Sequence, residues 1–454
     1  MSHNWTVEEL SHWANIVDAT ARSFGLQPRQ MDFVIVSPDR LIEIQAYNAP
    51  LGHAHWSRGK TFQVWQTMRD VKGAGALEVA FNADPCFAAL RPDQSFVAQL
   101  VIMAHTIAHN DFFANNRWFA KTSPDTILNR LAENRKLVNA YMKRYGEKQV
   151  EKVLDAAHAI AVQRPLVGGQ DRDWLLSYII DYSPSLQDWQ KDLCRVVENE
   201  TDHFIWQYET KIMNEGWASL WQKRIVNALP ITEEQRFEAK DWYAAITKRG
   251  ASSAFGEAVN PYHLGFAIFE DLKNRWDAMA EGSFISNEEN NDNDVWDGLN
   301  GTDKLLQVRS LYRDRRFLQD FLTQEVGIQL GLWRYGPNAR GSQMVIVTDT
   351  MEEGSFENIR NELMRDCGLG SFPSVSIKDT NYKNRHEWLF VHNWDGRDLD
   401  VSYTRLTLMA LFDLLGPVWL ETRTRKRNAP YFYYFDGASF LSGAEGSSRS
   451  TLPR

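Results

Sequence analysis

The sequence predicts an α+β protein. A large, mainly helical N-terminal domain, with a buried helix carrying a His-x-x-x-His pair, precedes a ferredoxin-like β-α-β-β-α-β domain. Through the first 280 residues apolar side chains recur about every 3.6 residues, as in helices, and beyond residue 340 about every second residue, as in strands. We therefore predict five segments: a mainly helical domain at 1–281, an acidic, Asn-rich linker at 282–303, a helical connector at 304–340, the ferredoxin-like domain at 341–437 and a flexible tail at 438–454.

The composition is that of a globular protein and argues against several classes. With 43% hydrophobic and 24% charged residues, neither disorder throughout nor a fibrous architecture is expected. The net charge of −9 argues against a nucleic-acid-binding protein. The longest apolar runs are far shorter than the roughly 18 residues that span a bilayer, and the first ten residues lack a signal-peptide pattern. Three widely spaced cysteines fit the reducing cytoplasm, where we expect the protein.

Local signals place the elements of the N-terminal domain. We expect a strand at 32–36, a helix at 37–47, a loop at 48–56 and a strand at 77–81. A helix capped by Ser95 should extend to about residue 115, and its apolar character around most of the circumference predicts burial. More helices should follow, with breaks near Gly146 and 168–169, one helix beginning at Ser185 and another covering 210–227.

The sequence pattern of the C-terminal part predicts a helical stretch at 311–332. After it, the pattern predicts strands and helices in the split β-α-β-β-α-β order. Its members are a strand at 344–348, a helix at 356–367, strands at 375–379 and 388–392, a helix at 403–415 and a strand at 418–424, with a further strand at 431–435.

The strongest candidate site lies in the buried helix. His105 and His109 are four residues apart, so their rings share one helix face and can converge on a single cation. Both rings lie at an apolar stripe, where polar groups without partners are costly. Two interpretations stay open: core histidines bonded to backbone or carboxylates, and two metal ligands.

Glu215 is the candidate third ligand. It is followed by Gly216 in the string Asn-Glu-Gly-Trp-Ala, and a glycine at that place in a helix permits close approach of another chain. A His2Glu set would leave one zinc position open for water. The alternative role for Glu215 is a structural hydrogen bond to a neighbouring backbone amide.

The Asn214-Glu215 string resembles the segment that supplies the glutamate ligand in gluzincin peptidases, with two departures. Thr106 stands where their catalytic glutamate would be, and 106 residues separate Glu215 from His109 instead of a couple of dozen. Ordinary gluzincin peptidase action is therefore disfavoured. A base would have to come from elsewhere, and Asp111 and Glu200 are the candidates.

Further histidines and aromatic residues are candidates for the same site. His53 and His55 lie in a His-x-His pair next to Trp56, which can serve a metal or an anionic ligand, although surface positions are the commoner outcome. His55 or His158 would complete the metal sphere, although packing is the commoner role for His158. Asn214 and Tyr262 are the further candidates to line the site. Tyr262 lies in the turn at 260–266, where Pro261 at the first helical position is the structural alternative.

Six blocks in matching order resemble the stage V sporulation protein R (SpoVR) family. They are residues 53–60 (HAHWSRGK), 82–86 (NADPC), 105–119 (HTIAHNDFFANNRWF), 211–221 (KIMNEGWASLW), 260–271 (NPYHLGFAIFED) and 314–322 (DRRFLQDFL). Two positions depart from the pattern: Ala54 stands where the family commonly has proline, and Ala108 where it usually has glycine.

The resemblance implies a cytoplasmic bacterial or archaeal protein with a role in the spore cortex, a peptidoglycan layer, or in starvation and stress response. It also implies two partners, a PrkA-type serine kinase and a von Willebrand factor A-like protein.

Two function hypotheses follow. One is a metal-dependent hydrolase in which His105, His109 and Glu215 hold zinc or another divalent cation. The other is a noncatalytic regulatory or scaffold protein that works with the two partners. Metal analysis separates them.

Overall fold

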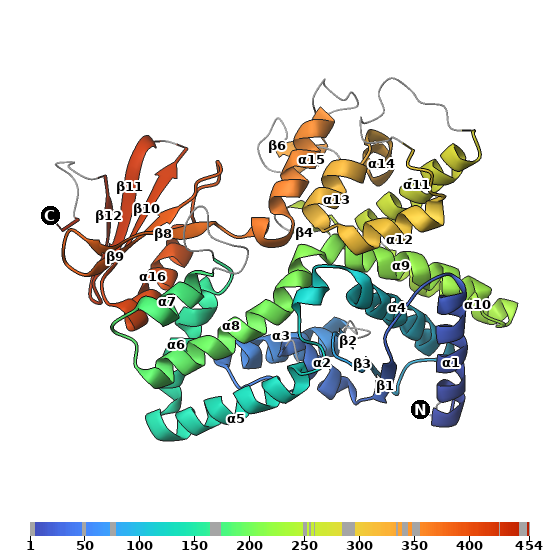
Figure 1. Ribbon diagram of the computed structural model, residues 1–454, viewed down its shortest axis with the longest axis horizontal. Helices are drawn as coiled ribbons and strands as arrows, with labels where there is room; N and C mark the ends of the chain where they lie inside the picture. Colours follow the sequence, from blue (N-terminus) through green and yellow to red (C-terminus); the bar gives the residue numbers. More distant parts are fainter. Residues whose placement is uncertain are drawn as a thin grey trace. The chain divides into compact units, whose positions relative to one another are not determined.

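The computed structural model describes residues 5–47, 51–72, 79–163, 174–247, 252–253, 256–257, 259–283, 296–332, 335–337, 344–346, 355–425, 427–444 and 452–453 (Figure 1). The chain forms two compact units, each assembled from separate stretches of sequence. The first comprises Met1–Pro50, Phe62–Leu128 and Trp206–Gly368, and the second comprises Leu51–Thr61, Asn129–Ile205 and Leu369–Arg454. The boundaries of the five predicted segments do not coincide with these two units. The division into five segments stays a prediction.

The first unit begins with a small sheet and a long buried helix. The sheet has the order β1-β3-β2, with β1 parallel and β2 antiparallel to β3. Ser37 and Ser95 cap the helices that follow them, each accepting a backbone N–H three residues on. The elements are α1 (Val7–Ser23), β1 (Met31–Ile35), α2 (Pro38–Ala46), β2 (Val79–Phe81), β3 (Cys86–Leu90), α4 (Phe96–Asn115) and the 3-10 helix Phe119–Lys121.

Helices α9 and α11 pack closely in the rest of the first unit. An added Cβ on Gly216 of α9 would lie 2.3 Å from the Gly265 backbone carbon of α11, so the two glycines permit the contact. This confirms the close approach that Gly216 predicted. The elements are α9 (Lys211–Ala228), α10 (Glu233–Thr247), β4 (Ser252–Ser253), β5 (Gly256–Glu257), α11 (Pro261–Ala280), α12 (Gly301–Leu311), α13 (Asp314–Phe321), α14 (Gln324–Leu330), β6 (Tyr335–Pro337), β7 (Met344–Ile346) and α15 (Ser355–Asp366).

The second unit packs a five-stranded sheet against helices. One sheet face and α16 share a buried apolar cluster with α6, α7 and α8, whereas Leu389, Trp419, Phe432 and Tyr434 form a smaller cluster on alternate positions. The elements are α3 (Trp56–Lys72, whose first residues belong here), α5 (Ile127–Tyr145), α6 (Glu147–Ile160), α7 (Leu175–Tyr182), α8 (Asp188–Glu209), the 3-10 helix Gly368–Ser371, β8 (Val375–Tyr382), β9 (Glu387–His392), α16 (Val401–Leu415), β10 (Val418–Thr424), β11 (Arg427–Phe435) and β12 (Phe440–Gly443).

The α+β class is confirmed, but the ferredoxin-like topology is not what the sheet shows. Its strand order is β12-β11-β10-β9-β8, with the single β-α-β crossover β9-α16-β10 and antiparallel pairs elsewhere. The expected first strand is β7, which pairs with β6 in a separate two-stranded sheet. The prediction was wrong because alternation identifies a strand without specifying its partner.

Smaller differences concern element ends. Helix α8 begins at Asp188, three residues after the expected Ser185, whose hydroxyl bonds instead to the Leu414 carbonyl. Residues 440–443 of the predicted flexible tail form β12 and pair with β11. Residues 284–295 of the predicted linker and the expected break at 168–169 lie outside the described residues.

Within the described chain, no helix combines the length and apolar character needed to cross a membrane.

Candidate metal centre

Helix α4 presents His105 and His109 to the interior of the first unit. Residues 97–113 of this helix are all buried, as the apolar pattern around its circumference predicted. The spacing of four places both imidazoles on one side, with ring centroids 4.6 Å apart. The neighbour on that side is α9, which supplies Asn214, Glu215 and Gln222.

The two rings are oriented by amide side chains of α9. His105 Nδ1 lies 2.7 Å from Gln222 Oε1, and His109 Nδ1 lies 2.9 Å from Asn214 Oδ1. An amide oxygen accepts hydrogen bonds only, so with these amide orientations each ring carries its proton on Nδ1. In a neutral ring, Nε2 then has the lone pair that a metal needs, as in histidines whose other nitrogen is fixed for metal binding.

Glu215 faces both of these nitrogens. Its Oε2 atom lies 3.5 Å from His109 Nε2 and 3.9 Å from His105 Nε2, too far for good hydrogen bonds. One donor atom from each of the three residues lies within 4.8 Å of the others, and all three residues are buried. This group could hold a metal ion.

The electrostatics keep Glu215 in its ligand form. Burial alone would raise the pKa of its carboxyl group, but interactions with His105, His109 and Lys211 hold that pKa well below its usual range. Lys211 lies one helical turn earlier on α9 and donates to Glu215 Oε1 at 2.8 Å, which leaves Oε2 directed to the histidines. Two imidazoles and one carboxylate are a common donor set for zinc.

Aromatic residues adjoin the histidine rings. Tyr262, the second residue of α11, lies nearly parallel to His105 with centroids 6.0 Å apart, and Phe113 lies similarly against His109. Asn260 caps α11 by accepting the Tyr262 N–H, with Pro261 as the first helical residue. Two of the predicted site-lining residues, Asn214 and Tyr262, therefore lie beside the three candidate ligands.

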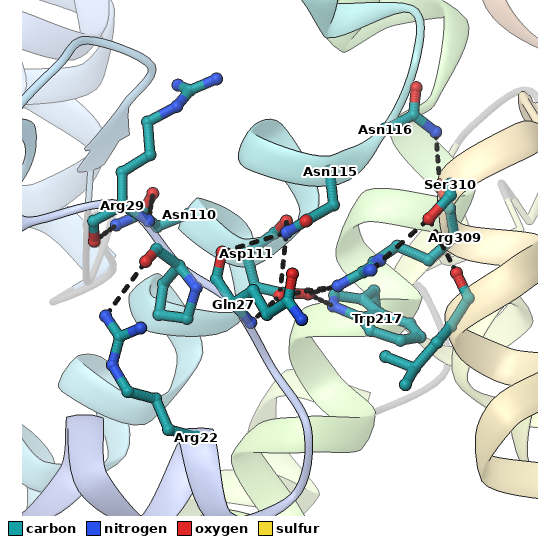
Figure 2. A network of polar contacts seen from close by, with 12 residues as sticks. Arg22, Gln27, Arg29, Asn110, Asp111, Asn115, Asn116, Trp217, Arg309 and Ser310 are labelled. Atoms are coloured by element: carbon teal, nitrogen blue, oxygen red, sulfur yellow. Dashed lines mark hydrogen bonds and ion pairs between the residues drawn. The ribbon is translucent and has the colours of Figure 1, made fainter.

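Asp111, a predicted catalytic base, lies elsewhere. It is two residues beyond His109 and thus on the other side of α4. Figure 2 shows its carboxylate within a polar network: Arg309 Nη1 donates to both oxygens at 2.7 and 2.8 Å, Gln27 N at 2.6 Å and Trp217 Nε1 at 3.0 Å. Asp111 and Arg309 therefore form a buried ion pair with a structural role. Thr106 is also turned away, since its hydroxyl donates to the Ile102 and Met103 carbonyls of its own helix.

The other predicted site residues belong to the second unit. Glu200 accepts hydrogen bonds from Arg58 at 2.9 Å and pairs with His53 Nδ1 at 3.1 Å. His55 pairs with Asp155 of α6, and Trp56 Nε1 donates to the same carboxylate. His158 lies one turn beyond Asp155. The structure thus places His53, His55, His158 and Glu200 in one cluster of the second unit, and His105, His109 and Glu215 together in the first.

Several contributors to these sites were not predicted, among them Lys211, Gln222, Asp155 and Arg309. Lys211 and Gln222 stand four residues before and seven residues after Glu215, so helical spacing alone places them on its face of α9. The helical spacing from Glu215 could therefore have identified both residues from the sequence. Arg309, the partner of Asp111, is 198 residues away in sequence, and no local pattern connects the two.

Comparison with known proteins is consistent with the family resemblance of the six sequence blocks between residues 53 and 322. The family model described as SpoVR like protein matches residues 4–168 and 166–372. The chain is similar to the uncharacterized protein YcgB of Escherichia coli (strain K12), with 26% identity over 437 residues covering 82% of this chain and 84% of that protein. No solved structure shows significant similarity. Because the family model covers most of its length, the chain belongs to the SpoVR family.

Proposed function

We propose that this SpoVR-family protein binds a divalent cation through His105 Nε2, His109 Nε2 and Glu215 Oε2, and that it is a metal-dependent hydrolase. The observation that carries the proposal is the arrangement of three buried donor atoms within 4.8 Å of one another, with both Nδ1 atoms engaged by amide oxygens. The buried carboxylate of Glu215 supplies a negative charge that attracts a cation to this site.

Zinc fits this donor set best. Imidazole nitrogens and a carboxylate oxygen are borderline ligands, and three protein ligands leave one position open, as in catalytic zinc sites. When bound, such a cation acts as a Lewis acid and lowers the pKa of a water. Asn214 and Gln222 fix the orientation of the two imidazole rings. Lys211 keeps Glu215 ionised, and the Tyr262 ring packs against His105.

Metal analysis of the purified full chain, after exposure to zinc and dialysis, tests the metal centre. We expect His109→Ala and Glu215→Gln to lose one equivalent of zinc relative to the wild type, since each removes a ligand. His12→Ala, which alters an exposed histidine of α1, is the matched control and should lose none. Unchanged zinc content in folded His109→Ala would contradict the proposal.

A noncatalytic regulatory or scaffold role is the second candidate function. It is favoured by one observation: the predicted bases Asp111 and Glu200 are both engaged, Asp111 by Arg309 and Glu200 by Arg58 and His53. Hydrolysis of a panel of peptide and muropeptide amides by the wild type, abolished in His109→Ala, supports the enzyme. Zinc binding without hydrolysis of any member supports the regulatory role.

We place either role in the cytoplasm, in spore cortex formation or in starvation and stress response, with a PrkA-type kinase and a von Willebrand factor A-like protein as partners. The support is family membership alone. Affinity capture with tagged wild type from the native host tests the partners, with a tagged unrelated protein as control. Failure to retain either partner would remove this part of the proposal.

A further inference from the structure

We propose that the second unit contains a separate divalent-cation site, formed by His53 and His55 of the loop before α3 and by Asp155 and His158 of α6. All four residues belong to this unit, so the inference does not depend on the His105 centre or on hydrolase activity.

The loop that carries the two histidines is fixed on both sides. Glu151 and Asp155 of α6 accept the backbone N–H and the indole N–H of Trp56 at 3.1 and 2.7 Å. On the other side, Arg58 joins the loop to α8, donating to Glu200 Oε2 and to the His53 carbonyl, both at 2.9 Å. The histidines are therefore held in place by contacts that do not use their Nε2 atoms.

The nitrogen atoms of His53 and His55 point to ligand roles. His53 Nδ1 pairs with Glu200 Oε1 at 3.1 Å, while its Nε2 is fully buried and has no hydrogen-bond partner. A buried polar atom without a partner is costly, which makes this nitrogen the strongest sign of a missing ligand. His55 Nδ1 pairs with Ser57 Oγ at 2.7 Å, and its Nε2 lies 3.2 Å from Asp155 Oδ1 outside hydrogen-bond geometry. Both rings thus engage Nδ1 and offer Nε2, as at the first centre.

Helix α6 supplies the opposing donors. Asp155 and His158 are three residues apart and so lie on one helix face. The His158 ring has its centroid 5.4 Å from that of His55 and 6.3 Å from that of His53. Two imidazoles from the loop and an imidazole and a carboxylate from α6 therefore lie near one another in this unit.

The charges favour a cation over an anion. Burial lowers the pKa of His55 to about 4, so this ring is neutral near pH 7 and can act as a ligand. Burial alone would raise the pKa of Glu200, but His53 and Arg58 bring it to about 2, so it is ionised and fixes the proton of His53 on Nδ1. Asp155 and Glu200 supply two carboxyl groups to this cluster beside the single guanidinium of Arg58.

The donors of this site are spread more widely than those of the first centre. Within the described chain, His105, His109 and Glu215 are the one group whose three donor atoms all lie within 4.8 Å. His158 is exposed, so its ring can turn towards the buried Nε2 of His53 without disrupting the core. We expect cation binding to draw this ring inward.

Zinc titration calorimetry on the metal-depleted full chain tests the site. The His105→Ala/His109→Ala variant, which removes the first centre, should still bind one equivalent of zinc. Adding His158→Ala or Asp155→Asn should weaken this binding by at least about 10–100-fold, the range seen when even an outer partner of a metal ligand is removed. The Asp155→Asn change keeps an oxygen acceptor for the Trp56 indole, and His12→Ala is the surface control.

Two results would overturn the inference: no zinc bound by the folded His105→Ala/His109→Ala variant, or equal binding with and without His158→Ala. If the double variant fails to fold, the comparison moves to the otherwise wild-type chain. There His158→Ala should reduce the stoichiometry from two to one, and an unchanged stoichiometry refutes the site. Loss of zinc in His109→Ala with this site intact would concern only the first centre.

Discussion

At the scale of single residues, the partner of each Nδ1 atom decides what His105 and His109 can do. Gln222 and Asn214 offer oxygens that only accept, so each ring carries a proton on Nδ1, and a neutral ring then has its lone pair on Nε2. A histidine spacing of four in sequence cannot distinguish this arrangement from two packed core histidines, because the spacing fixes the ring positions and leaves the proton positions open.

Asn214 gives a direct test of this orienting role. Asn214→Ala should weaken zinc binding by about 10–100-fold while the fold is retained, because His109 loses the partner that fixes its proton and ring angle. Asn227→Ala, an exposed change on the same helix, should leave the affinity unchanged. Competition with a chromophoric chelator measures both, and equal affinities for the two variants would argue against orientation by Asn214.

Asp111 shows how a residue next to a ligand motif acquires a structural role. Its carboxylate is fully buried and lies against Arg309 Nη1, with Gln27 and Trp217 as further donors (Figure 2). The network joins the segment after α1 to α4, α9 and α12.

Arg309→Met should destabilise the first unit by about 3–5 kcal/mol, because it leaves the Asp111 carboxylate buried without its cation. Arg22→Met removes an exposed pair with Asp18 and a hydrogen bond to the Pro28 carbonyl, and it should cost less, about 1 kcal/mol. Urea unfolding followed by fluorescence measures both free energies. A cost for Arg309→Met as small as that of Arg22→Met would show that Asp111 is not held by this ion pair.

At the scale of elements, α9 organises the first unit. One face carries Asn214, Glu215 and Gln222 against α4, and Gly216 gives α11 room to approach. At its start, Asp314 accepts the backbone N–H groups of Ile212 and Met213. The ligand and the glycine are adjacent in sequence because one helix must serve two neighbours.

Gly216→Ala should therefore destabilise the protein by about 3 kcal/mol, since the new Cβ would meet backbone atoms of α11 that cannot move aside alone. Gly59→Ala is the matched control: it lies in α3, no heavy atom lies within 4 Å of its added Cβ, and a stabilisation of about 0.5–1 kcal/mol is expected. Chemical denaturation distinguishes the two. A neutral Gly216→Ala would mean that α9 and α11 can separate at no cost.

At the scale of the whole molecule, both units are discontinuous in sequence. The chain enters the second unit at 51–61 and 129–205 before returning to it at residue 369. Each candidate metal site lies within one unit, and in each the donors come from segments about 100 residues apart.

The sheet of the second unit predicts an acid-dependent loss of stability. Burial lowers the pKa of His392, whose Nδ1 lies 2.9 Å from Thr422 Oγ1. As the pH falls below the ordinary histidine pKa, the unfolded chain takes up a proton that the folded ring resists, so the free energy of unfolding decreases. His392→Gln keeps a polar group but does not titrate, and it should reduce this slope between about pH 7 and about pH 5.5. Parallel slopes for wild type and variant in urea titrations would exclude His392 as a contributor.

The sequence by itself determined the elements with strong local signals. The helix start at Ser37, the cap Ser95, the breadth of the apolar surface of α4, the histidine spacing and the glycine after Glu215 are local features. The structure confirms what each predicted about its own segment. The helices at 356–367 and 403–415 and the strands β8 to β10 were found for the same reason.

Only the tertiary structure decided which segments meet. It placed β7 with β6 instead of in the main sheet, Asp111 against Arg309, and His53 with Glu200. Strand pairing, ion pairing and metal-ligand convergence depend on contacts between residues up to 198 positions apart in these examples. Periodicity specifies which face of an element is apolar or polar, whereas the partner of that face is selected by packing of the whole chain.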